Sequence, residues 1–410
     1  MINRLKNARK EYPGQFWILF VGMLVSTIGQ SMIWPFLTLY VSKKLGLPLA
    51  QTAALVSMNA FTGLIFSLIA GPIVDRLGRK WVMVISLVGN GILYAAMRYA
   101  DTYLEFAVIQ SLMGALTPLY RVGADAMLAD LIVPEKRNDA YSLIRMSSNA
   151  GVSIGPAIGG LVASTSYALA FYISAAGLSF YGLLIAFLAK ETLLVDASAP
   201  SKKETMFSGY GQIFRHGSFM GFIGSLTLTS MLVSLVWVLL PVYTNFNFQM
   251  PESQYGFIPT TNAIMVVTLQ LLVTQLIRRR KPMAMMTLGT LLSAIGTVMI
   301  AFFSGFWGFW LCMVVMTFGE LVLVPTATTF TANVAPLEMR GRYMSFYWMT
   351  SYVASFLAPV FGGILNDSYG GRFIWYGGGV IGVLAVAAFL VLTIKVDKNA
   401  QRSANQLSNP

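Results

Sequence analysis

The stretch GPIVDRLGRK, residues 71–80, places four charged side chains between two long apolar runs. One run, residues 52–73, leads into it, and a second, residues 81–100, follows it. Each run has about the 20 residues that an α-helix needs to cross a lipid bilayer. The stretch therefore indicates two membrane-spanning helices joined by a short, charged loop.

Ten further apolar runs of similar length lie on either side of this pair. Of the 410 residues, 56% are hydrophobic and only 11% are charged, whereas a soluble protein carries roughly a quarter charged residues. The fold class predicted is an all-α polytopic membrane protein with twelve transmembrane helices. The predicted spans are residues 16–41, 52–73, 81–100, 104–129, 140–164, 167–189, 217–244, 254–277, 284–303, 307–332, 342–365 and 373–394.

The lysines and arginines are unevenly distributed over the two sets of loops between these runs. Of the 28, the set that includes both termini carries 22, the other set carries three, and three lie inside the runs. Because cytoplasmic loops are enriched in Lys and Arg, both termini are predicted to be cytoplasmic in a multi-pass protein of the cell membrane. The net charge of +12 then reflects topology and attraction to anionic lipid, and no nucleic-acid partner is expected.

The chain divides near its midpoint at a polar stretch. We predict a first six-helix bundle over residues 1–189, a cytoplasmic linker over 190–216, a second bundle over 217–394 and a cytoplasmic tail over 395–410. An offset of 203 residues aligns Met146 with Met349, Pro156 with Pro359 and Gly159 with Gly362. Such an internal repeat indicates two homologous halves with a substrate cavity at their interface.

With the two-half pattern established, residues 71–80 resemble the loop signature of the major facilitator superfamily. The resemblance implies two pseudo-symmetric six-helix bundles. It also implies a cytoplasmic gate, in which the loop aspartate faces helix 11 and a loop arginine pairs with an acid at the end of helix 4. The gate residues would be Gly71, Asp75, Arg76, Gly78, Arg79 and Lys80, with Asp130 and Arg342 as partners. Gly71 would allow close helix approach and Gly78 a tight turn. A run of charges that only sets topology is the alternative.

Residues 151–160, GVSIGPAIGG, resemble the helix 5 motif of the drug/proton antiporter branch of this family. The motif residues are Gly151, Gly155, Pro156, Gly159 and Gly160. Small residues four apart allow tight packing, and the proline permits a bend, so packing alone remains an alternative. The arginine usual in helix 4 of that branch is replaced by Gln110, so its role is not carried over.

Four ionisable residues inside the spans are predicted to couple transport to protons: Glu320, Asp125, Arg121 and Arg145. Ionisable groups at membrane depth are functional candidates because their burial is costly. Arg121 and Asp125 are one helical turn apart, and depth counting allows Asp125 to pair with Arg145. A structural salt bridge, or a Glu320 bonded to a backbone carbonyl, is the alternative. The two carboxylates make the chain similar to multidrug exporters of the LmrP type.

The substrate site is expected to combine Glu320 with a polar and aromatic lining. By analogy with the family, that lining is Gln30, Trp34, Trp237, Tyr347, Trp348 and Tyr352. Aromatic faces suit lipophilic cations, and the 23 methionines suit a pliable pocket. Each aromatic could instead face lipid or anchor a helix end at the interface.

The function predicted is proton-coupled export of amphiphilic or cationic small molecules by alternating access. The expected partners are a small-molecule substrate, protons and the lipid bilayer, and the chain is expected to be a monomer without cofactor or metal. An exporter or flippase for an endogenous metabolite, sugar or lipid is the alternative. The single Cys312 and single His216 leave no zinc cluster, disulfide framework or histidine-based triad, so the chain is not expected to be an enzyme.

Overall fold

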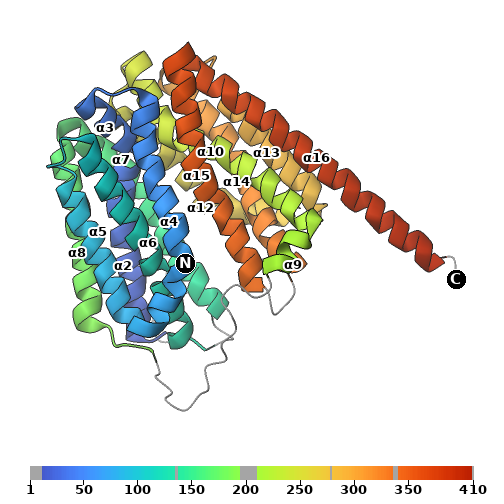
Figure 1. Cartoon of the computed structure of the whole chain (residues 1–410), viewed down its shortest axis with the longest axis horizontal. Coiled ribbons are helices and arrows are strands. Elements are labelled where there is room, and N and C mark those ends of the chain that lie inside the picture. Colours follow the sequence, from blue (N-terminus) through green and yellow to red (C-terminus); the bar gives the residue numbers. More distant parts are fainter. Residues whose placement is uncertain (1–11, 134–136, 194–209, 278, 336–339, 409–410) are drawn as a thin grey trace. The chain divides into compact units, whose positions relative to one another are not determined.

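A computed structural model describes every residue except 1–11, 134–136, 194–209, 278, 336–339 and 409–410 (Figure 1). The described residues are almost entirely helical and include no strand. Contacts divide the chain into two compact units: residues 1–199 with 241–267, and residues 200–240 with 268–410. Each unit is considered separately below.

The first unit contains seven longer helices, a 3₁₀ turn and a short helix from later in the chain. These are α2 (Gly14–Ile33), η1 (Trp34–Phe36), α3 (Leu37–Leu45), α4 (Leu49–Leu77), α5 (Arg79–Ala96), α6 (Tyr103–Leu131), α7 (Arg137–Thr165), α8 (Tyr167–Leu188) and α11 (Glu252–Tyr255).

The second unit contains α9 (Tyr210–Arg215), α13 (Pro282–Met299), α14 (Gly305–Val334), α15 (Arg340–Tyr369) and α16 (Arg372–Ser408). Two helices are divided between the units. The first is α10 (Gly217–Phe248), in which the division falls at Pro241, and the second is α12 (Phe257–Ile277), in which it falls after Val267. Proline removes one backbone hydrogen bond, so α10 changes unit where its ladder is weakest.

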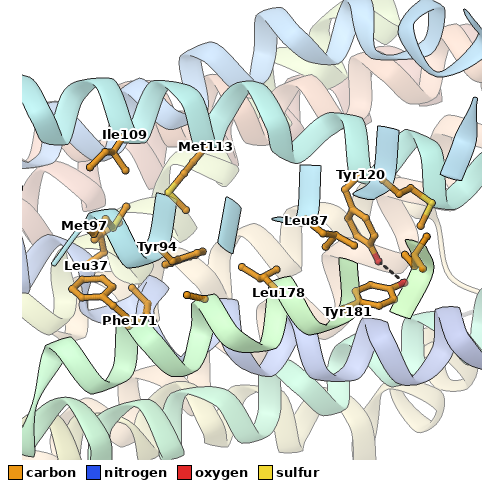
Figure 2. Packing of buried hydrophobic residues seen from close by; sticks show 14 of the residues in the cluster. Leu37, Leu87, Tyr94, Met97, Ile109, Met113, Tyr120, Phe171, Leu178 and Tyr181 are labelled. Carbon is orange, nitrogen blue, oxygen red and sulfur yellow. Dashed lines mark hydrogen bonds between the residues drawn. The ribbon is translucent and has the colours of Figure 1, made fainter. Parts of the chain in front are cut away.

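The core of the first unit lies between α3, α5, α6 and α8, where large side chains turn toward one another (Figure 2). The Tyr120 hydroxyl donates to the Tyr181 hydroxyl at 3.3 Å, and Tyr181 donates to the Leu19 carbonyl at 3.4 Å. A Cβ at Gly22 would overlap the Tyr181 ring, so only glycine admits this tyrosine beside α2. These two buried tyrosine hydroxyls are thus hydrogen-bonded, which lowers the cost of placing them in a membrane interior.

In the second unit α13 packs closely on α14. A Cβ at Gly289 would lie 2.8 Å from the Gly319 carbonyl, and one at Gly319 would lie 2.5 Å from the Gly289 carbonyl. The Thr229 and Thr290 hydroxyls lie 3.1 Å apart and connect α10 to α13. Small residues and short polar side chains allow this close helix packing.

All twelve predicted runs fall on helices, and the predicted all-α fold is confirmed. Eight helical stretches of the described chain are long and apolar enough to cross a membrane; the other predicted runs lie on α5, α6, α7 and α12. Large exposed apolar side chains along these helices suit contact with lipid. The domain boundaries and the cytoplasmic side of the termini stay predictions. Most of the predicted linker lies outside the described residues, which place α9 at its end.

Candidate functional site

A polar cluster lies at one end of the first unit, around the end of the 71–80 stretch, and is here called the 71–80 cluster. Its members are Gly78, Arg79, Asp130, Glu191 and Thr192. Arg79 Nε lies 3.2 Å from Asp130 Oδ2, and the Thr192 hydroxyl donates to the same oxygen at 2.9 Å. The arginine begins α5, while the aspartate closes the last turn of α6. The arrangement connects the start of α5 to the end of α6 and to the segment after α8.

Glu191 caps the first turn of α5. Its carboxylate accepts hydrogen bonds from the backbone amides of Arg79, at 2.9 Å, and Lys80, at 3.1 Å. Burial acts to raise the pKa of Glu191, but hydrogen bonds from the amides of Leu193, Arg79, Lys80 and Thr192 outweigh it, so the pKa is lowered. Gly78 has a φ of 88°, which residues other than glycine rarely adopt, and a Cβ there would meet the Glu191 carboxylate. Both the backbone conformation and the lack of space therefore require glycine.

The other residues predicted for the gate take varied positions. The side chain of Arg76 is exposed, and Lys80 Nζ lies 5.1 Å from the centre of the Trp81 ring. A Cβ at Gly71 would have no described heavy atom within 4 Å, so the close approach expected at Gly71 is not found. The side chains of Asp75 and Arg342 lie outside those that the structure describes.

The motif of α7 packs on α2 and on the segment around α11. Cβ atoms at Gly151, Gly155 and Gly159 would meet Thr27, Ser31 and the backbone of Met32 within 3 Å. At Gly160 a Cβ would lie 2.3 Å from the Glu252 carbonyl. The Pro156 carbonyl faces Gly256, where a Cβ would approach it to 2.4 Å. The motif therefore forms a flat, side-chain-free surface on two sides of α7.

Three charged residues predicted to lie inside the spans of α6 and α7 have exposed side chains: Arg121, Asp125 and Arg145. Among the described residues no ion pair connects Asp125 to Arg121 or to Arg145, so the pairing across the two helices is not formed in this structure. Arg121 lies within electrostatic range of Asp125, and the Tyr141 hydroxyl donates to the Asp125 backbone carbonyl at 3.0 Å. Gln110, nearer the start of α6, is buried, and its backbone carbonyl accepts a hydrogen bond from the Asn59 side chain at 3.2 Å.

Glu320 is half-buried in the second unit, on α14. It lies 15 residues after Gly305 and 11 before Thr331, in a span whose mean hydropathy is 1.8. The Gln270 side chain donates to the carbonyl of the next residue, Leu321, at 3.1 Å and lies 3.0 Å from the Thr274 hydroxyl. A carboxylate thus lies near the middle of an apolar helix, and an amide from α12 contacts the backbone of the residue that follows it.

The residues predicted to surround the substrate are divided between the units. Gln30 is half-buried and Trp34 is 44% exposed in the first unit, whereas Trp237 and Tyr352 are half-buried in the second. On α15, Tyr347 is buried with its hydroxyl 3.1 Å from Thr328, and Trp348 is 53% exposed beside it. The cavity that the two sets would form together stays a prediction.

Sequence reasoning did not identify Glu191, Gln270 or Glu252 as functional candidates. Glu191 and Glu252 lie between apolar runs, and the only available signal was a carboxylate directly after or before a span. Gln270 interrupts an otherwise apolar stretch of α12, which was a usable signal because amides are rare at that depth.

With this geometry described, comparison with known proteins identifies the class. Residues 19–359 and 223–409 match the Major Facilitator Superfamily, and the chain belongs to that family. It is therefore an integral transporter of the cell membrane rather than an enzyme, and a small molecule is its substrate.

Two bacterial relatives and one solved structure illustrate the range of the likeness. A Na(+), Li(+), K(+)/H(+) antiporter of Planococcus maritimus is 24% identical over 86% of this chain and 89% of the relative. Quinolone resistance protein NorA of Staphylococcus aureus is 22% identical over 86% of this chain and 90% of the relative. The nucleoside transporter NupG shares the fold with a TM-score of 0.80 at 14% identity, over 93% of this chain and 99% of NupG.

Proposed function

We propose that this transporter exchanges protons for amphiphilic or cationic small molecules and exports them from the cell. The observation that carries the proposal is Glu320, a carboxylate half-buried near the middle of the apolar helix α14. A single carboxylate at that depth holds a proton or attracts a cation, and binding one opposes binding of the other. That competition is the basis of antiport.

Two further features support the proposal. The helix 5 motif resembles that of the antiporter branch, and the relatives include a quinolone resistance protein and a cation/proton antiporter. In the proposed cycle, protonation of Glu320 releases cargo on the outside. Asp125, with Arg121 and Arg145 nearby in the sequence, couples a second proton or the cytoplasmic gate to that release.

The test uses purified protein in liposomes, with a pH gradient of either sign imposed across the membrane. A fluorescent lipophilic cation and an internal pH dye are followed together. Gradient-driven cation movement with opposite proton flow is expected from the natural chain and lost in Glu320→Gln. The control is Asp367→Asn, which neutralises an exposed carboxylate of the same unit and should transport normally. Undiminished proton-driven export by Glu320→Gln would overturn the role of Glu320.

Exchange of Na⁺, Li⁺ or K⁺ for protons is a second candidate, favoured by the Planococcus maritimus relative. The same liposomes distinguish it, because these ions alone would then change the internal pH without any organic cation. If well-inserted protein moves neither the organic cation nor these metal ions, an uncharged metabolite, sugar or lipid would be favoured as the cargo.

A further inference from the structure

The short helix α11 is held against the first unit at a flat contact. Gly160 of α7 faces the Glu252 carbonyl, and Gly256 directly after α11 faces the Pro156 carbonyl. Tyr255 is buried, with its ring 5.8 Å from that of Phe36 in an edge-to-face arrangement. At the two glycines the contact with α7 is backbone on backbone and involves no interlocking long side chains, so that part of the surface can separate and meet again without repacking α7.

Glu252 supplies the directional contact of α11. Its Oε1 atom lies 2.7 Å from Lys43 Nζ of α3 and accepts from the Tyr167 hydroxyl of α8 at 2.8 Å. The side chain of Glu252 is only 10% exposed. The Lys43 side chain is 39% exposed, so only the carboxylate side of the pair is shielded, and the Tyr167 hydroxyl adds a second donor to that carboxylate.

Lys43, Tyr167 and Glu252 lie at the opposite end of α4 from the 71–80 cluster. Lys43 precedes α4, whereas Gly78 follows its last turn, and α4 is 29 residues long. In the predicted topology this end faces the outside of the cell. The segment 241–267 that carries α11 continues at both ends into helices divided between the units.

We propose that Lys43, Tyr167 and Glu252 form a latch that closes the outward-facing end of the transporter and opens once in each cycle. The proposal rests on the proposed transport by alternating access. In such a cycle the segment 241–267 has to leave the first unit for the outward end to open. Pro241, where α10 lacks a backbone hydrogen bond, allows this movement, and the flat glycine contact permits it to reverse.

The experiment measures the separation of α11 from α7 directly. Cys312 is the single cysteine, so Cys312→Ala gives a background without thiols. Thr165→Cys and Gln254→Cys then place spin labels at two exposed positions that take no part in the latch, one at the end of α7 and one on α11. Double electron–electron resonance spectroscopy in lipid nanodiscs then gives the populations of short and long distances between the two spin labels.

Glu252→Gln and Lys43→Met should each lower the ratio of the short-distance to the long-distance population roughly tenfold, as expected for loss of a charged hydrogen bond. The exchange Lys43→Glu with Glu252→Lys should restore most of that ratio, which also shows that the variants fold. Asp101→Asn is the matched control, because it breaks the 2.9 Å pair with Lys44 at the same end without touching α11.

Unchanged distance populations in both single variants would overturn the latch. The measurement needs no cargo, so its result is separate from that of the transport assay. Latch-dependent distances in a protein that moves neither cations nor protons would support the latch and count against the proposed cargo. Normal exchange of cations for protons, with label distances that do not change in the latch variants, would support the proposed cargo and count against the latch.

Discussion

Gly159 of α7 marks one of the closest helix approaches in the first unit, since a Cβ there would lie 2.2 Å from the Met32 carbonyl. The neighbour is backbone, so Gly159→Ala should force α2 and α7 apart and cost about 1–3 kcal/mol. Thermal unfolding in detergent should show a lower midpoint than for the natural chain. Gly177→Ala is the control, because its Cβ would meet Val25 at an ordinary 3.6 Å. Equal midpoints for the two variants would contradict the close contact.

Glu252 gives the latch a defined pH range. Burial acts to raise the pKa of Glu252, but hydrogen bonds from Lys43, its own backbone and Tyr167 outweigh it and hold the pKa below the usual 4.5. The facing titratable groups are Lys43 of α3 and Tyr167 of α8, with Tyr40 beside Tyr167.

A lowered carboxyl pKa stabilises the latch above the usual pKa, and the stabilisation is lost as pH falls through the lowered value. We therefore expect the label distances to be constant from about pH 8 to about pH 5.5 and the long-distance population to grow only below about 4.5. A midpoint near neutral pH would show that the carboxylate lacks these hydrogen bonds.

At the scale of elements, the first turn of α5 depends on a carboxylate from beyond α8. Removing it by Glu191→Ala leaves the amides of Arg79 and Lys80 without their acceptor. Their hydrogen exchange should accelerate roughly tenfold. The control is Glu105→Gln, which weakens the cap of α6 by altering the acceptor of the Asp101 and Thr102 amides, and should leave α5 unchanged. Faster exchange at α6 in both variants, with α5 unaffected, would contradict the assignment.

The long helices could be predicted from the sequence because a helix that crosses a bilayer needs a long run of apolar residues. Such runs are visible directly in the sequence. It did not predict α9 or α11, which are too short to leave such a pattern. The resemblance suggested Asp130 as a partner for a loop arginine. It did not indicate Glu191, because the partners of Glu191 are backbone amides, which every residue carries.

Depth counting placed Asp125 and Arg145 at similar levels of their helices but carried no information on helix rotation. The structure shows both exposed and not paired with each other. Glu252 was missed for another reason: its ion partner lies 209 residues away, and neither residue lies in a periodic pattern. Contacts between distant segments depend on tertiary packing, which a single sequence does not display.

At the scale of the whole molecule, the distribution of Lys and Arg predicts the side of the membrane on which each end lies. A green fluorescent protein fused after residue 410 should fluoresce in bacterial cells, because it folds only in the cytoplasm, while an alkaline phosphatase fused there should be inactive. Fusions within the loop that follows Lys44 should give the opposite pair of results. Active phosphatase at residue 410 would reverse the topology and place the latch on the cytoplasmic side.

The cap on α5 also has a consequence for biosynthesis. Glu191 follows Arg79 by 112 residues, and Lys190 exchanges hydrogen bonds with Gln15 across 175 residues. At about 5–20 residues per second, a ribosome takes roughly 6–22 s to add Glu191 after Arg79. Throughout that interval the first turn of α5 has no acceptor from Glu191, and the cap forms only when the sixth predicted span has been made. Ribosome-bound chains in which residue 191 is still inside the ribosome should therefore expose this turn to added protease, and chains long enough for residue 191 to have emerged should be protected.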